Sequence, residues 1–304
     1  MPVNEPGRAA ATGATAQVRR RNANQRWRAF TRFMRGKPLG ATGLIIVFFG
    51  VFVAVAGPSL VPHDPYDVNS NIILKAPNSS YWFGTDTLGR DVFSRTVYGA
   101  RISMIVGVTG TIMATLAGTI IGVSSGYLGG KFDLVVQRFI DGLTAFPSLL
   151  LAIALVAAFG ASFYNVILAL SITFTPRISR VVRSAALSIQ EMPYVDAARV
   201  IGASPVRIMM QHVLPNVFAP LLVVATASVG TMIVTEASLS FLGVGIPAKV
   251  ISWGSMLSGQ VLQYFANAPW IGLFPGAALT TVVFGVNVFG DALRDTLDPK
   301  LRGR

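Results

Sequence analysis

Cysteine is absent from this chain of 304 residues, and charged residues are scarce. The lack of cysteine excludes both a disulfide framework and a thiolate metal site. Charged residues make up 12% of the chain, whereas a typical soluble domain carries about 25%. Because 52% of the residues are hydrophobic, this composition favours segments that face lipid over a surface that faces water.

Positive charge is plentiful but unevenly distributed. The formal net charge is +12, and nine of the 25 Lys and Arg residues precede residue 38. A strongly basic chain can bind nucleic acid, but no RRM-like or zinc-finger pattern accompanies these residues. We therefore expect no nucleic-acid partner, and we expect the basic residues to set the orientation of the chain in a membrane.

Long charge-free runs predict an all-α, polytopic membrane helix bundle. A helix needs about 20 apolar residues to cross the hydrocarbon core of a bilayer. The run 142–176 is too long for one crossing, and its centre, Phe159 to Asn165, is turn-like. The sequence predicts one transmembrane domain, 37–304, preceded by a basic tail, 1–36. Six transmembrane helices are predicted, at about residues 39–61, 102–126, 138–159, 164–183, 214–237 and 271–290.

Lys and Arg in the connecting segments predict the side of the membrane on which each segment lies. With six spans, twenty of the 25 fall on the side of the two termini and five on the other. Both termini are therefore predicted to be cytoplasmic, in a multi-pass protein of the cell (inner) membrane. In the tail, Trp27, Phe30 and Met34 share one helical face among arginines, which is typical of an interfacial helix on anionic lipid. A basic tail with no specific role is the alternative.

The second predicted span carries a stripe of small residues at four-residue spacing. Such spacing makes a flat helix face that a second helix can approach closely. Packing within this chain and pairing with another subunit both use such stripes, and we expect the former. The residues of the stripe are Gly110, Ala114, Gly118, Gly122 and Gly126.

The segment 190–213 predicts a cytoplasmic loop with two short helices that meet at a corner. Pro193 suits the first position of a helix and Gly202 its C-terminal cap. Ser204 and Pro205 then suit the start of a second helix. On the first helix Ala197, Ala198 and Ile201 lie close to one another and are small enough to enter a groove in another protein. A connector that packs on its own bundle is the alternative.

The residues of this loop resemble a known family. Asp196-Ala-Ala, then Gly202, and then Leu214-Pro215 resemble the EAA loop of ABC importer permeases, although Asp196 stands where that loop has Glu and His212 where it often has Ile. Three further stretches resemble permeases of the dipeptide and oligopeptide C type: Phe83 to Ser103, Glu236 to Gly243, and Gly290 to Arg302.

The resemblance implies a type I, MetI-like permease subunit of a binding-protein-dependent importer. Its implied partners are a homologous permease subunit, one or two cytoplasmic ATPase subunits and an extracytoplasmic substrate-binding protein, with lipid around it. The implied cargo is a di- or oligopeptide, with nickel complexes and glutathione as alternatives. The implied ATPase-coupling residues are Tyr194, Asp196, Ala197, Ala198, Ile201, Gly202, Leu214 and Pro215.

The chain is predicted to have no catalytic, cofactor-binding or metal-ligating residues. The phosphate-binding sequence Gly-x-x-x-x-Gly-Lys-Ser/Thr does not occur, so ATP hydrolysis is expected of partner subunits. An intramembrane enzyme would need a nucleophile with a base within reach, and a secondary transporter would show a repeat with midplane charges; the sequence favours neither. Glu236, near the outer end of the fifth predicted span, is either a gate element or a helix-end contact.

Overall fold

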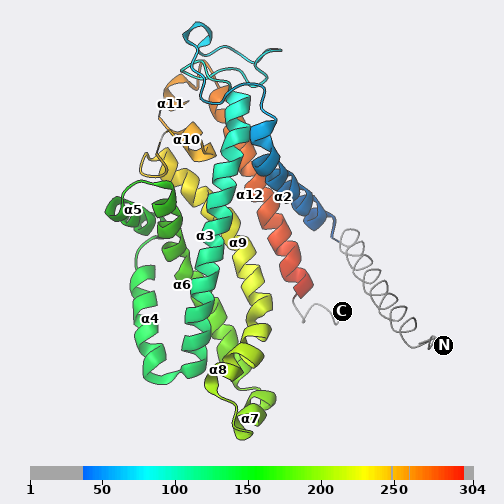
Figure 1. Cartoon of the computed structure of the whole chain (residues 1–304), viewed down its shortest axis with the longest axis vertical. Helices are drawn as coiled ribbons and strands as arrows, with labels where there is room; N and C mark the ends of the chain where they lie inside the picture. Colours follow the sequence, from blue (N-terminus) through cyan, green and yellow to red (C-terminus); the bar gives the residue numbers. More distant parts are fainter. Residues whose placement is uncertain (1–36, 248, 260, 298–304) are drawn as a thin grey trace, which may run out of the picture.

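The computed structural model describes residues 37–247, 249–259 and 261–297. The basic tail 1–36, with its predicted interfacial helix, lies outside the described residues. The described part is an elongated bundle of helices (Figure 1). Its helical elements are α2 (Pro38–Ala56), η1 (Gly57–Ser59), η2 (Ser70–Ile72), α3 (Val92–Leu128), α4 (Gly130–Thr144), α5 (Ser148–Phe159), α6 (Phe163–Gln190), α7 (Pro193–Val200), α8 (Pro205–Ile208), the π-helical turn η3 (Met209–Val213), α9 (Leu214–Phe241), α10 (Trp253–Leu257), α11 (Val261–Tyr264) and α12 (Trp270–Leu297).

Helix α3 is much longer than the predicted span 102–126. It begins at Val92 because the Asp91 side chain accepts hydrogen bonds from the backbone N–H groups of Phe93 and Ser94, at 3.3 and 3.1 Å. It ends at Leu128, and Gly129 follows as the C-cap with a φ of +62°, which suits glycine. Its 37 residues are about 55 Å long at 1.5 Å per residue, so the helix is longer than the ~30 Å membrane core.

The third predicted span, 138–159, is not one straight helix. The helix is interrupted between Thr144 and Ser148, and α4 and α5 meet at an angle of 92°. Pro147 lies in the break and lacks a backbone N–H, and its ring clashes with the preceding turn of a continuous helix. The prediction missed this break because an apolar run through a proline still looks continuous by hydropathy.

The number of membrane-crossing helices is only partly established. Among the described residues, four helical stretches are long and apolar enough to cross a membrane, or five if the bent pair α4–α5 counts as one span. Six spans are therefore not confirmed. Helix α6 has the length to cross, at 28 residues, but Arg177, Arg180 and Arg183 interrupt its apolar character.

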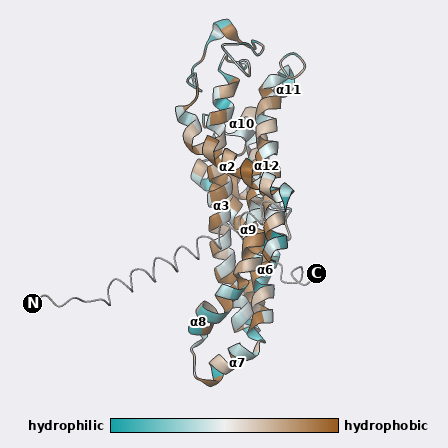
Figure 2. Cartoon of the chain, turned by 90° about the vertical axis from the view of Figure 1, so that its right-hand side faces the viewer, coloured by the Kyte–Doolittle hydropathy of each residue, from teal (hydrophilic) through white to brown (hydrophobic). Residues whose placement is uncertain are grey.

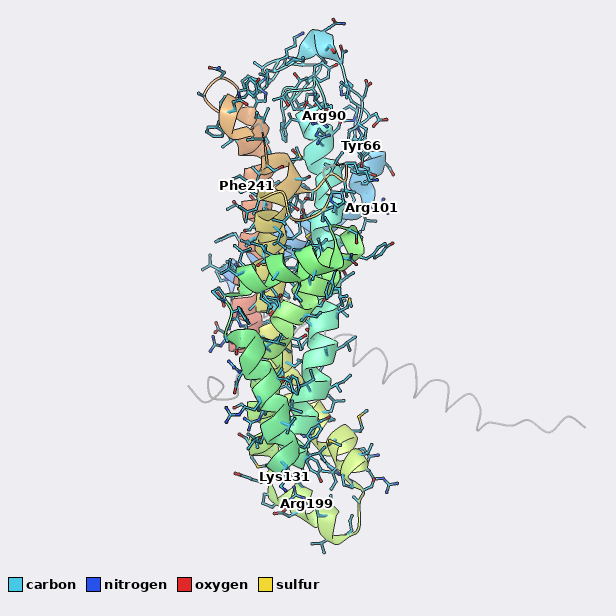
Figure 3. All side chains as sticks on the ribbon, turned by 90° about the vertical axis from the view of Figure 1, so that its left-hand side faces the viewer. Tyr66, Arg90, Arg101, Lys131, Arg199 and Phe241 are labelled. Atoms are coloured by element: carbon cyan, nitrogen blue, oxygen red, sulfur yellow. The ribbon has the colours of Figure 1, made fainter. Side chains whose placement is uncertain are left out.

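The core of the bundle lies between α3, α6 and α9, which pack side by side, while α2 covers α12. Figure 2 shows hydrophobic residues over much of the long helices and hydrophilic residues at α8 and in the loops of the opposite end. Figure 3 places Lys131 and Arg199 at one end of the bundle and Tyr66 and Arg90 at the other. The two ends therefore differ in structure: one carries the α7–α8 corner, and the other carries the segment 57–91 with α10 and α11 (Figure 1).

Candidate functional site

The α7–α8 corner has the local structure that the sequence predicts. Pro193 occupies the first turn of α7. Gly202 follows the helix with a φ of +82°, a backbone conformation that glycine adopts without strain. The Ser204 hydroxyl accepts a hydrogen bond from the backbone N–H of Arg207 at 3.4 Å and so caps α8. These local signals explain why the corner could be read from short stretches of sequence.

The corner buries one face of α7 and exposes the other. Val195 and Ala198 are buried in the core of the bundle. Val200 and Ile201 are 87% and 83% exposed, although both are apolar. Ala198 therefore differs from the expectation that it faces a partner, since it packs on its own bundle. The exposed face is formed instead by Ala197 beside the two apolar residues at the corner.

The remaining predicted coupling residues lie on α7 or at the start of α9. Tyr194 and Asp196 are exposed, and the Asp196 carboxylate pairs with Arg199 at 2.9 Å. The Arg199 guanidinium also lies 5.6 Å from the centre of the Tyr127 ring at the end of α3, within the range of a cation–π contact. The half-buried Leu214 and the exposed Pro215 begin α9 directly after η3.

The small-residue stripe of α3 lies against α6 within this chain. A Cβ atom on Gly122 would come within 2.6 Å of the Ser179 carbonyl oxygen, and one on Gly126 within 2.8 Å of the Ala186 Cβ. A Cβ atom on Gly118 would lie 2.8 Å from the Ile178 side chain. Ala114 is fully buried, and a Cβ atom on Gly110 would meet Met232 of α9, while the Gly110 carbonyl oxygen accepts a hydrogen bond from Ser171 of α6 at 3.2 Å. The close approach of α3 and α6 leaves no room for side chains at these glycines.

Glu236 lies in α9, is completely buried and accepts only hydroxyl hydrogen bonds in the described part of the chain. Ser240 and Ser252 donate to its Oε1 at 2.8 and 3.0 Å. Ser103 donates to its Oε2 at 3.4 Å and accepts from the backbone N–H of Trp253 at 3.2 Å. We call Glu236 with these three serines the serine–carboxylate cluster. It joins α3, α9 and the start of α10.

Sequence reasoning found Glu236 but missed its partners. Ser252 caps α10 in a reciprocal capping box with Ser255, and that Ser-x-x-Ser pattern was the available signal. Ser103 lies 133 positions from Glu236, so no local pattern could have joined them. The pair between Asp133 and Arg183, which ties α4 to α6, was also missed; its signal was an acidic residue in the first turn of a helix.

Comparisons with known proteins agree with this architecture. Residues 118–303 match the family of binding-protein-dependent transport system inner membrane components, and residues 25–77 match the N-terminal transmembrane domain of oligopeptide transport permease C. The chain is 41% identical to the dipeptide transport system permease protein DppC of Alkalihalophilus pseudofirmus, over 91% of this chain and 90% of that protein. It is 39% identical to the oligopeptide transport system permease protein OppC of Bacillus subtilis, with 99% of each chain covered.

Two further matches extend the comparison. The glutathione transport system permease protein GsiD of Pectobacterium atrosepticum is 36% identical, over 94% of this chain and 95% of that protein. Among solved structures, an inward-facing form of the MetNI methionine ABC transporter superposes with a TM-score of 0.55. At 18% identity, covering 67% of this chain and 96% of that one, this likeness concerns the fold.

Proposed function

Because the chain belongs to the family of binding-protein-dependent transport system inner membrane components, we propose that it forms half of the pathway of an ATP-driven peptide importer. The observation that carries this proposal is the exposed apolar surface of the α7–α8 corner, formed by Ala197, Val200 and Ile201. A small apolar projection at the end of a bundle fits a groove in a second protein, because its burial there removes apolar surface from water.

The corner is built to transmit movement into the bundle. Helix α8, the π-helical turn η3 and α9 form one continuous helical stretch, 205–241. A displacement of the corner by a closing ATPase dimer would therefore tilt α9 along its length, with η3 as the point that adjusts, since π-helical turns are locally irregular. At its far end this stretch carries Glu236, which holds α10 through Ser252. Closure of the ATPase dimer at the α7–α8 corner would thereby move α10 and open or close the outer end of the bundle.

The proposed assembly contains a homologous permease subunit, one or two cytoplasmic ATPase subunits and an extracytoplasmic binding protein. We place both termini in the cytoplasm and count six crossings, with the bent pair α4–α5 as the third and α6 as the fourth. The positive charge of the α7–α8 end supports this orientation. The absence of cysteine makes a labelling test simple: a membrane-impermeant thiol reagent would reach a cysteine at Asn78 from outside the cell and would fail to reach one at Ser204.

The proposed cargo is a di- or oligopeptide. The names of the dipeptide and oligopeptide permeases at about 40% identity support this choice, and the glutathione permease supports a peptide-like molecule more broadly. Nickel complexes are the second candidate, because the wider branch that the sequence resembles includes them. The charges of the outer segment also support a peptide, because that segment mixes Asp86 and Asp91 with Arg90 and Arg95 and is not an acidic funnel for a bare cation.

Uptake by cells tests the proposal. A strain that lacks this chain is expected to lose growth on di- to pentapeptides as the sole source of a required amino acid, and to regain growth with the plasmid-borne chain. Ile201→Glu is expected not to restore growth, although the protein reaches the membrane. Normal peptide growth in the deletion strain, together with lost nickel uptake, would replace peptides by nickel complexes as the cargo.

A further inference from the structure

A charged cavity lies at the end of the bundle opposite the α7–α8 corner. It occupies about 370 Å³ between the start of α3 and the short helices α10 and α11. Its charged lining residues are Asp86, Arg90 and Arg95, and Leu88, Ser255 and Ser258 also line it. That volume falls within the range of about 300–1,000 Å³ that small-ligand sites occupy. The ATPase coupling proposed above does not involve this cavity.

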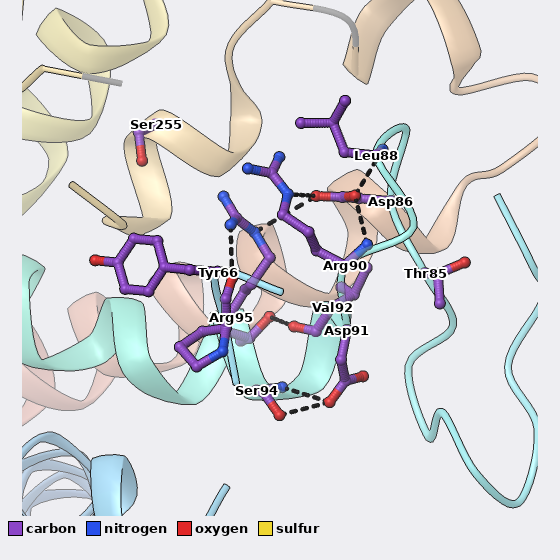
Figure 4. Close-up of polar contacts among 12 residues, drawn as sticks. Tyr66, Thr85, Asp86, Leu88, Arg90, Asp91, Val92, Ser94, Arg95 and Ser255 are labelled. Carbon is purple, nitrogen blue, oxygen red and sulfur yellow. Dashed lines mark hydrogen bonds and ion pairs between the residues drawn. The ribbon is translucent and has the colours of Figure 1, made fainter. Parts of the chain in front are cut away.

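The two arginines share one carboxylate. Arg90 Nε lies 2.7 Å and Arg95 Nε 3.5 Å from the same Asp86 oxygen, Oδ2. Arg95 Nη1 donates to the Pro65 carbonyl oxygen at 2.9 Å. Figure 4 shows the two guanidinium groups next to each other, with Asp86 on one side of them and Ser255 on the other. Among the described residues, neither terminal nitrogen of Arg90 has a hydrogen-bond partner.

The charge of the cavity is incompletely neutralised. Two guanidinium groups and one carboxylate give a net charge of +1 among the described lining residues. The Arg95 side chain is only 7% exposed, so water solvates its charge poorly, and a buried charge without full pairing is costly. A second anion between the guanidinium groups would complete the pairing. The unpaired nitrogens of Arg90 form a planar fork, which matches the two oxygens of a carboxylate.

We infer that this cavity binds the free C-terminal carboxylate of a short peptide. The inference rests on the proposed function, because a peptide importer must receive its cargo at the outer end of the bundle. Arg90 would donate to the carboxylate, and Arg95 would supply charge at close range in a site with little water. The Ser258 hydroxyl donates to the Ser255 carbonyl oxygen at 2.7 Å, which leaves its oxygen lone pairs free to accept from a peptide N–H.

Direct binding tests this inference separately from transport. The full chain in phosphatidylcholine nanodiscs is titrated calorimetrically with dialanine and with dialanine amide, which lacks the carboxylate. Dialanine is expected to bind at least about tenfold more tightly than the amide, because a hydrogen bond to a charged group is lost. Arg90→Gln is expected to weaken dialanine binding by a similar factor and to abolish the preference. Arg101→Gln, which removes an exposed arginine further along α3, serves as the matched control and is expected to change neither.

The variant Asp86→Asn distinguishes a loss of binding caused by misfolding of the loop from a loss caused by the changed charge. The asparagine oxygen can still accept from the backbone N–H groups of Leu88 and Arg90, as Asp86 Oδ1 does at 2.9 and 3.0 Å. The variant raises the charge of the cavity, so it is expected to tighten dialanine binding, which a misfolded loop would not do.

Each outcome of the titrations decides the inference. Equal binding of dialanine and its amide, equal effects of Arg90→Gln and Arg101→Gln, or no dialanine binding up to about 10 mM would overturn it. If these titrations fail while the deletion strain still loses peptide growth, the cavity assignment alone is wrong. If they succeed while peptide growth is unaffected by the deletion, the site stands and the proposed transport role is wrong.

Discussion

Removal of the Glu236 carboxylate is expected to release α10 from the bundle. One of its hydrogen bonds reaches α10 directly, from Ser252, which begins that helix. The bond from Ser103 joins α3 to α9, and the bond from the Trp253 backbone to Ser103 does not involve Glu236. A hydrogen bond contributes about 1 kcal/mol net. Glu236→Ala should therefore lower the free energy of opening α10 by about 1 kcal/mol, which corresponds to a population of the open form about fivefold higher.

The chain offers a clean reporter of this opening, since it has no native cysteine. Met256 lies on α10 and is 8% exposed, so a cysteine there reacts with a maleimide when α10 opens. The labelling rate is expected to rise about fivefold in Glu236→Ala, in proportion to the open population. In Glu236→Gln it should rise less than about twofold, because the amide oxygen still accepts from Ser252.

Ser238→Ala is the matched control on the same helix. Its hydroxyl is exposed and donates to the Val234 carbonyl oxygen of its own helix at 2.8 Å, so its loss should leave the labelling rate unchanged. Equal labelling rates in the alanine, glutamine and control variants would show that the serine–carboxylate cluster does not hold α10.

Two further predictions concern the packing of the bundle and can be checked by thermal unfolding in detergent. Gly122→Leu places a Cβ atom 2.6 Å from the Ser179 carbonyl oxygen and should lower the free energy of unfolding by about 1–3 kcal/mol or more. A Cβ atom at Gly142 has no neighbour within 4 Å, so Gly142→Leu should leave the stability unchanged. Equal Tm values for the two variants would contradict the close contact between α3 and α6. Asp133→Asn breaks a pair with Arg183 whose side chains are 17% and 29% exposed and should lower the Tm by several degrees, at about 2–4 °C per kcal/mol. Asp141→Asn breaks the exposed pair with Arg180, which contributes about 0–1 kcal/mol, so its Tm should fall less. An equal fall in Tm for the two asparagine variants would show that the partial burial of the Asp133 pair adds no stability.

The sequence predicted what depends on neighbouring residues. Pro193, Gly202 and Ser204 act within one or two turns, and the α7–α8 corner is present as expected. Long apolar runs likewise predicted the positions of α2, α9 and α12. Membership of the permease family followed from motifs in the same short stretches, and the comparisons confirm it.

The sequence could not predict what depends on direction or distance. A helical face shows which residues lie together but not whether they point to the bundle or to a partner. The sequence therefore left both directions open for Ala198, and the structure buries it in the bundle. Hydropathy averages over Pro147 and hid the 92° bend between α4 and α5. The partners of Glu236 come from α3 and α10, and only the fold brings them together.

Docking of the α7–α8 corner on ATPase subunits can be measured in the purified importer. The importer is purified with its ATPase subunits through a tag on this chain, and ATP hydrolysis in the purified complex is compared for Ile201→Glu and for Ile73→Glu, an exposed isoleucine at the other end of the bundle. Burying a carboxylate in an apolar groove is costly, so Ile201→Glu should lose the ATPase subunits and at least about tenfold of the hydrolysis, while Ile73→Glu keeps both. Full ATPase recovery and normal hydrolysis with Ile201→Glu would show that the corner does not dock on the ATPase subunits.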